Sequence, residues 1–165
     1  PVMAAGMRFG PRIAELWQNQ EMDRIRWTTR TFTWTTSVLT LGIAVTLAGA
    51  GPRVMEIFGP DFPESAPLLW YIAGAQVFNA ACGPVTMLLA MSGRSGRALW
   101  GQIAGLTANV LIGAALIPAY GTRGAAIAMA SGIVVVNVIL LAMAKAHHGF
   151  DPSIRGILVP FGMKR

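Results

Sequence analysis

The chain has 165 residues, of which 54% are hydrophobic and only 12% are charged, and its mean hydropathy is +0.55. A soluble domain of this size usually has about 25% charged residues, so the polar surface here is too small to cover a water-soluble globule. One cysteine excludes an internal disulfide, and no CxxC motif or Cys/His cluster indicates a metal, so we expect no cofactor. The charges cluster between long uncharged windows, which predicts an all-α, polytopic membrane protein.

Residues 1–30 precede the first uncharged window and form the predicted cytoplasmic linker. The chain begins with Pro1 and shows no signal-peptide pattern, so we interpret it as part of a longer protein. Within the linker, Ile13–Arg30 combines charged residues with apolar ones such as Trp17 and Trp27. It can therefore form an amphipathic helix on the cytoplasmic membrane surface, and a plain interdomain connector is the alternative.

Four uncharged windows follow, and each is long enough to cross a membrane as a helix. A bilayer core about 30 Å thick needs roughly 20 helical residues. The windows predict a transmembrane domain at 31–146 with spans at 31–52, 66–92, 98–119 and 124–144. None alternates polar and apolar residues as a barrel strand would.

The linkers between the spans constrain the topology. Short linkers at 93–97 and 119–124 leave room only for tight turns, so neighbouring helices should be antiparallel. Prolines are expected to break the chain between the first two spans, because proline cannot donate a backbone hydrogen bond. These are Pro52, Pro60, Pro63 and Pro67.

Lysine and arginine predict the orientation, because loops rich in them stay in the cytoplasm. Near the spans, one side carries seven basic residues: Arg24, Arg26, Arg30, Arg94, Arg97, Lys145 and Arg155. The other side carries Arg53 and Arg123. Both termini, including the tail 147–165, should therefore be cytoplasmic. The formal charge of +6 is then an insertion signal, and we expect no nucleic-acid partner.

Every predicted span has one polar or small face when its residues are placed 100° apart. Small residues let helices approach closely and amides hydrogen-bond between helices, so packing is the simpler interpretation. The alternative is a hydrated cavity, in which amides suit sugar hydroxyls because each offers a donor and an acceptor. The cavity candidates are Gln76, Asn79, Thr86, Gln102 and Asn109, and the packing candidates include Gly105, Gly124 and Gly132.

Gly83 and Pro84 interrupt the second span. Pro84 cannot donate to the carbonyl of Ala80, and Gly83 gives a neighbouring backbone room to approach. We therefore predict a kinked helix with a polar inner stripe. Its opposite, apolar side should carry Phe78, Val85 and Leu89, and Cys82 should be a small buried residue.

No Asp, Glu, Lys, Arg or His lies within the predicted spans. An intramembrane proton relay normally needs such residues, so we expect any coupling ion to bind elsewhere or to be absent. An active site within the membrane needs them as well, so we expect no enzymatic activity. Arg94 and Arg97 should first set the topology, and they are also candidates for contact with lipid phosphates. His147 and His148 point about 100° apart on a helix, so we interpret them as interfacial residues instead of metal ligands.

The stretch Glu56–Ala128 resembles the C-terminal part of bacterial polysaccharide and O-antigen flippases, which move lipid-linked oligosaccharides. These belong to the multidrug/oligosaccharidyl-lipid/polysaccharide exporter superfamily. Three elements carry the resemblance: an FG pair at Phe58, a GP…LL…SG helix from Gly83, and an N…LIP.YG..GAA turn from Asn109. The preceding linker PVMAAGMRFGPRIAELW is also similar to that of the family.

The resemblance implies a transporter of twelve or fourteen helices in two lobes, working by alternating access in the bacterial inner membrane. Its cargo would be an undecaprenyl-diphosphate-linked oligosaccharide, and its other partners the lipid bilayer and the remaining transmembrane helices. Two alternatives stay open. One is an exporter of the same superfamily with another cargo, a drug or a peptidoglycan precursor. The other is a non-transport membrane scaffold.

Overall fold

The fold is known from a computed structural model that describes residues 2–57, 59, 66–148 and 151–154. Its described part contains helices and no strand, which confirms the predicted all-α class. The elements are α1 (Val2–Gln18), α2 (Met22–Glu56), α3 (Leu68–Cys82), α4 (Val85–Met91), α5 (Ser95–Tyr120) and α6 (Thr122–His148).

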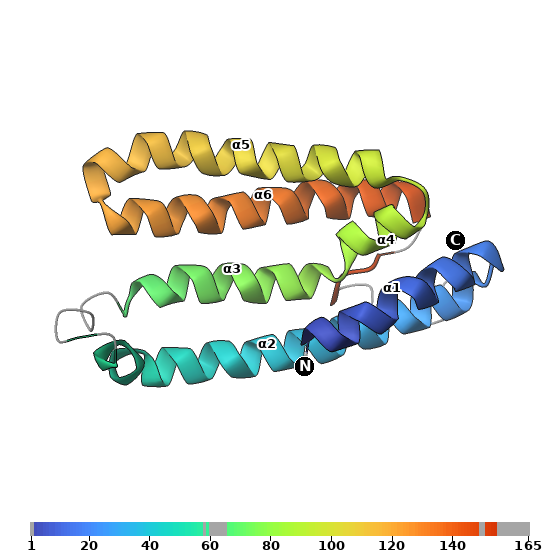
Figure 1. The fold of residues 1–165 in the computed structure, drawn as a ribbon, viewed down its shortest axis with the longest axis horizontal. Coiled ribbons are helices and arrows are strands. Elements are labelled where there is room, and N and C mark those ends of the chain that lie inside the picture. Colours follow the sequence, from blue (N-terminus) through green and yellow to red (C-terminus); the bar gives the residue numbers. More distant parts are fainter. Residues whose placement is uncertain (1, 58, 60–65, 149–150, 155–165) are drawn as a thin grey trace.

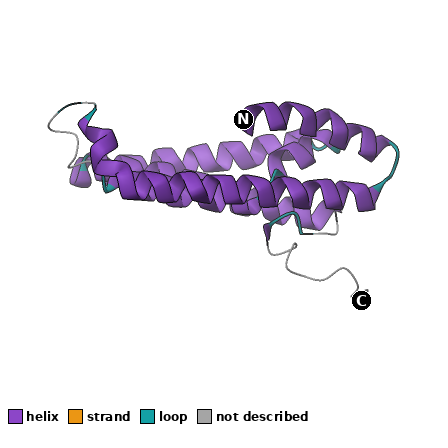
Figure 2. Ribbon diagram, turned by 90° about the horizontal axis from the view of Figure 1, so that it is seen from below, coloured by secondary structure: helices purple, strands orange, loops and turns teal. Residues whose placement is uncertain are grey.

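The long helices lie side by side in the order α5, α6, α3, α2 (Figure 1). Helices α2 and α3 are antiparallel, as are α5 and α6, whereas α3 and α6 run in the same direction. Figure 2 shows α1 on one side of this layer. Short α4 packs against α1, α5 and α6 and thereby connects α1 to the long helices.

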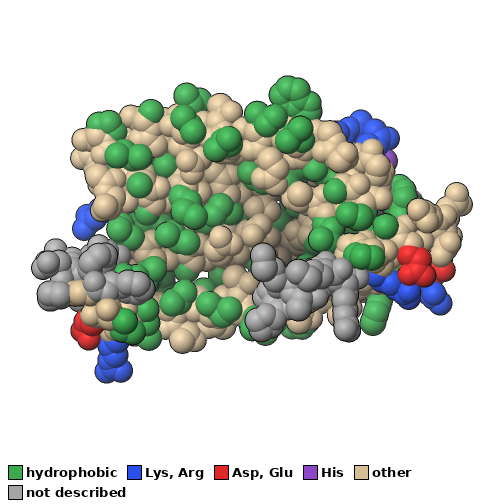
Figure 3. All heavy atoms as spheres, viewed as in Figure 1, with side chains coloured by type: hydrophobic (Ala, Val, Ile, Leu, Met, Phe, Trp, Pro, Cys, Tyr) green, Lys and Arg blue, Asp and Glu red, His purple; other side chains and the backbone are tan. Residues whose placement is uncertain are grey.

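Three described helices, α2, α5 and α6, are long and apolar enough to cross a membrane. The pair α3 and α4 is a fourth candidate if its two halves count as one bent span. Hydrophobic side chains are scattered over the middle of the visible face, and the charged ones lie near its two ends (Figure 3). The basic turn between α4 and α5 lies at the same end as the start of α2 (Figure 1). Which end faces the cytoplasm stays a prediction.

The prediction of one amphipathic helix over Ile13–Arg30 is wrong. Helix α1 ends at Gln18, and α2 begins at Met22. Between them Gln20 adopts φ +56°, while the Gln20 and Glu21 N–H groups donate to Trp17 and Leu16 carbonyls at 3.1 and 3.0 Å. This is a Schellman helix end with Gln where Gly is usual. The chain therefore turns back, and the predicted linker becomes α1 plus the first turns of α2.

Pro52 does not break the chain as expected, because it lies inside α2, which continues to Glu56. A proline removes one helical hydrogen bond, and membrane helices tolerate this loss when the freed carbonyl is satisfied locally. With 35 residues α2 is about 52 Å long at 1.5 Å per residue, well beyond one bilayer core. Pro67 is the N-cap residue of α3. Pro60, Pro63 and Phe58 lie outside the described residues.

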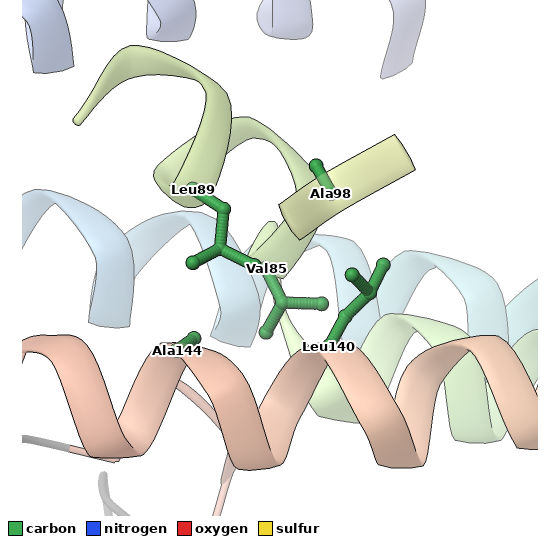
Figure 4. Close-up of a cluster of buried hydrophobic side chains, with 5 residues drawn as sticks. All are labelled: Val85, Leu89, Ala98, Leu140 and Ala144. Atoms are coloured by element: carbon green, nitrogen blue, oxygen red, sulfur yellow. The ribbon is translucent and has the colours of Figure 1, made fainter. Parts of the chain in front are cut away.

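Two buried apolar clusters meet at α4. The first joins α1, α2 and α4 through Ile13, Leu16, Ile25 and Leu88. The second joins α4, α5 and α6 through Val85, Leu89, Ala98, Leu140 and Ala144, which Figure 4 shows gathered where the three helices meet. The expectation that Val85 and Leu89 lie on an outer apolar face is wrong. The chain breaks just before α4, so its faces do not continue those of α3.

Glycines bring α5 and α6 into direct backbone contact, as the packing interpretation predicts. A Cβ added to Gly132 would lie 2.9 Å from Asn109 Cβ and 3.0 Å from the Gly105 carbonyl oxygen. A Cβ on Gly105 would collide with the Val136 side chain, and one on Gly124 with the Leu116 backbone. Larger residues at these glycines would push the two helices apart.

We predict that Gly132→Val lowers the free energy of unfolding by about 1–3 kcal/mol, the usual cost of overpacking. Gly42→Val on α2 is the matched control, because nothing lies within 4 Å of a Cβ there. Denaturant unfolding in detergent, followed by circular dichroism, measures both. Equal stability of the two variants would contradict the close helix contact.

Candidate functional site

The site is built around the interruption between α3 and α4. Helix α3 ends at Cys82, Gly83 adopts φ +78°, and α4 starts after Pro84 at an angle of 41° to α3. The Gly83 N–H still donates to the Ala80 carbonyl at 3.1 Å, whereas the proline nitrogen has no hydrogen to donate. The predicted kink is confirmed, and it is a complete break of the helix.

Gly83 is required here for two separate reasons. Its φ lies in the left-handed region, which residues with a Cβ rarely adopt. In addition, a Cβ would lie 2.6 Å from the Pro152 carbonyl oxygen and equally close to Thr33 Oγ1. The expected close approach of a neighbouring backbone is therefore present, and the neighbour is the segment that follows α6.

Two adjoining hollows open beside the break. The first, about 430 Å³, is lined by residues of α3, α4, α5 and α6. The second, about 340 Å³, is lined by residues of α2, α3, α4 and α6 and includes Gly83 and Pro84 in its wall. Both hollows share Asn79, Thr86 and Asn137, so they are neighbours across one polar ridge. Their volumes fall in the range of small-molecule sites.

The structure brings together all five predicted cavity residues. Four of them line the first hollow, namely Asn79, Thr86, Gln102 and Asn109, and Gln76 lines the second. Their mutual hydrogen bonds are long: 3.5 Å from Gln102 Nε2 to Thr86 Oγ1, and 3.3 Å from Asn79 Nδ2 to Gln76 Oε1. Long bonds are weak, so these amides keep donor and acceptor capacity for a ligand or water.

Sequence reasoning missed Asn137. This side chain is 4% exposed, donates from Nδ2 to the Ile133 carbonyl at 2.8 Å, and borders both hollows. At 100° per residue it lies roughly opposite Gly124 and Ala128, the small-residue face on which the sequence prediction for α6 rests. Helix α6 lies between α5 and α3, so it needs two inward faces. The sequence signal for Asn137 is that it is an amide inside the most apolar of the candidate spans.

The walls of both hollows combine amide and hydroxyl groups with apolar side chains such as Ile133 and Met87, and they carry no charge among the described residues. Hydroxyls of Thr36 and Thr40 from α2 add to the amides of the second hollow. Among the described residues, no Asp, Glu, Lys, Arg or His lines either hollow. Such a wall can exchange hydrogen bonds with a neutral hydroxylated group. It offers no partner to an ion, whose burial without a counter-charge is costly.

Arg94 and Arg97 lie away from the hollows, at the turn into α5, and both are exposed. In the described part of the chain neither forms an ion pair, unlike Arg12, Arg24 and Lys145. Their positive charge therefore stays available at the end of the bundle.

Two of the remaining candidate residues, Cys82 and His147, lie outside the hollows. Cys82 is 3% exposed, which confirms the predicted burial. The His147 ring lies 5.8 Å from that of Trp17, so it packs against α1. The side chain of His148 is outside the described residues. Over the described ranges, no group of three or more His, Cys, Asp or Glu residues could hold a metal ion.

Comparisons of the chain with protein-family models, curated proteins and solved structures found no match. The family resemblance of Glu56–Ala128 therefore stays a prediction.

We predict that Gly83→Ala lowers the free energy of unfolding by about 1–3 kcal/mol, the cost of a strained left-handed residue. Gly74→Ala on α3 serves as the control, because a Cβ there meets nothing within 4 Å and alanine favours a helix. Thermal unfolding of both variants in detergent micelles gives the comparison. A Gly83→Ala protein as stable as the Gly74→Ala protein would refute the strained break.

Proposed function

We propose that this chain is the C-terminal part of a transporter that flips lipid-linked oligosaccharide or polysaccharide precursors across the bacterial cytoplasmic membrane. The observation that carries the proposal is the pair of uncharged, amide-lined hollows between candidate membrane-spanning helices. The resemblance of Glu56–Ala128 to polysaccharide flippases supports the same function. We propose a transport role and no catalytic one.

The chemical class of the cargo is inferred from the residues that line the hollows. A sugar presents many hydroxyls, each both donor and acceptor, and amide side chains match both roles. Asn79, Asn109 and Asn137 lie within one hollow and can share such hydroxyls. The diphosphate of the carrier lipid would have no counter-charge there, so in this proposal it stays at the membrane interface.

Arg94 and Arg97 are the proposed contacts for that interface. Arginine binds phosphate oxygens through several donors at once, and anionic headgroups attract basic residues at a membrane surface. Both side chains are exposed at the end of the bundle that also carries α1. In this arrangement lipid phosphates meet the arginines while the neutral glycan meets the amides.

The break at Gly83 and Pro84 is the proposed point of flexing. Alternating access requires helices to bend or rock at a few backbone positions. An interrupted helix can change its angle there without breaking further helical hydrogen bonds. Because both hollows include residues from each side of the break, such a movement would reshape them.

We predict that the double variant Asn79→Leu/Asn109→Leu in the intact transporter reduces flipping of a fluorescent lipid-linked oligosaccharide in proteoliposomes by roughly 5- to 150-fold. Leucine leaves sugar hydroxyls without hydrogen-bond partners, which costs roughly 1–3 kcal/mol in total. Thr107→Val is the control, because Thr107 is exposed on α5 and bonds only its own helix, at 2.9 Å to Ile103.

Normal flipping by the double variant, at equal expression and stability, would contradict the proposal. It would favour the scaffold alternative, which the close glycine packing of α5 and α6 also suits. An exporter of cationic drugs is disfavoured, because no acidic side chain lines the hollows among the described residues.

A further inference from the structure

A short turn after α6 folds against the helix break. In Asp151–Ser153, the Asp151 Oδ1 atom accepts hydrogen bonds from the Ser153 backbone N–H at 2.9 Å and from Ser153 Oγ at 2.6 Å. Pro152 is fully buried and Ser153 is 5% exposed. The turn is thus locally ordered by its own aspartate and packed into the protein.

Two anchors on different helices hold this turn. Lys145 Nζ on α6 lies 2.7 Å from Asp151 Oδ2. Thr33 Oγ1 on α2 donates to the Pro152 carbonyl at 3.1 Å, across 119 residues of sequence. Thr33 has no exposed surface, so its hydroxyl would lose its partner if the turn moved away.

The anchored carbonyl touches the break itself. A Cβ on Gly83 would lie 2.6 Å from the Pro152 oxygen, so the turn rests directly on the Gly83 backbone. Gly83 and Pro84 form part of the second hollow. The turn therefore lies behind the wall of that hollow, at the joint between α3 and α4.

We propose that Asp151–Ser153 is a latch that holds the break between α3 and α4 in its bent state. While the latch is closed, the Pro152 carbonyl and Thr33 hold the backbone at Gly83 from one side. When it opens, α4 is free to change its angle to α3, and the second hollow changes shape. The latch goes beyond the proposed transport function, because it is independent of what the hollows bind.

The ion pair that anchors the turn lies partly in water. The Lys145 and Asp151 side chains are 41% and 26% exposed, so their ion pair is partly screened by water. Partial burial by itself raises the pKa of Asp151. Hydrogen bonds from Lys145 and Ser153 outweigh this effect and lower the pKa below its ordinary value. The carboxylate thus stays charged at neutral pH, and its contribution is lost only in strong acid.

Cys82 provides a built-in reporter for the test. It is the only cysteine of the chain, it is 3% exposed, and it immediately precedes Gly83. Opening of the latch should uncover it. The experiment measures the rate at which a water-soluble maleimide labels Cys82 in the full chain reconstituted in liposomes.

We expect Thr33→Val and Asp151→Asn each to increase the labelling rate about fivefold, as the loss of one net hydrogen bond implies. Thr33→Val changes no charge, so a faster reaction cannot come from an electrostatic effect on the thiol. The control Thr46→Val should leave the rate unchanged, because the Thr46 hydroxyl is exposed and bonds only Gly42 of its own helix.

A charge exchange completes the test. Asp151→Lys alone should label fast, and Lys145→Asp combined with Asp151→Lys should return most of the way to the original rate. Unchanged labelling in Thr33→Val, or no recovery in the exchanged pair, would overturn the latch. Circular dichroism verifies folding, and the charge-neutral Thr33→Val variant carries the test if Asp151→Lys unfolds. Labelling requires no cargo, so failure of the latch and failure of the transport proposal are distinguishable.

Discussion

The break at Gly83 and Pro84 determines the direction of α4 and therefore which helices α4 contacts. A proline without an N–H and a glycine with positive φ end α3 and start α4 at an angle of 41°. Because of that angle, Leu88 reaches the cluster with α1, while Val85 and Leu89 reach the cluster with α5 and α6. The same break opens the two hollows, whose shared wall includes Asn79 and Thr86 on either side of it.

Close packing of α5 against α6 stabilises the part of the bundle that lies beside the break. Helices α5 and α6 approach through Gly105 and Gly132 so tightly that a Cβ would meet backbone atoms at 3.0 Å. In a membrane, such contacts replace the hydrophobic effect as the main force between helices. The closely packed pair α5 and α6 lies next to the interrupted pair α3 and α4. The polar ridge of Asn79, Thr86 and Asn137 lies where the two parts meet.

Much of this arrangement could be predicted, because it follows from composition and a fixed helical period. Windows without charge gave the long helices, and residues 100° apart gave the shared face of Gln102 and Asn109. What could not be predicted depends on a single backbone angle or on a distant contact. A positive φ at Gln20 separates α1 from α2, and a helical wheel drawn through the break misplaces Val85 and Leu89. The contact of Thr33 with Pro152 spans 119 residues and has no local signal.

If the amide-lined hollows are wet and not merely packing faces, side chains on their walls are open to a polar reagent. Single cysteines on a Cys82→Ala background, labelled by a membrane-impermeant maleimide in liposomes, measure this access. Thr86→Cys and Gln102→Cys, in the wall of the first hollow, should react at rates near those of water-exposed thiols. Val110→Cys, on an exposed apolar part of α5, should stay unlabelled in lipid. If all three positions were equally unreactive, the hollows would be dry and the account would be contradicted.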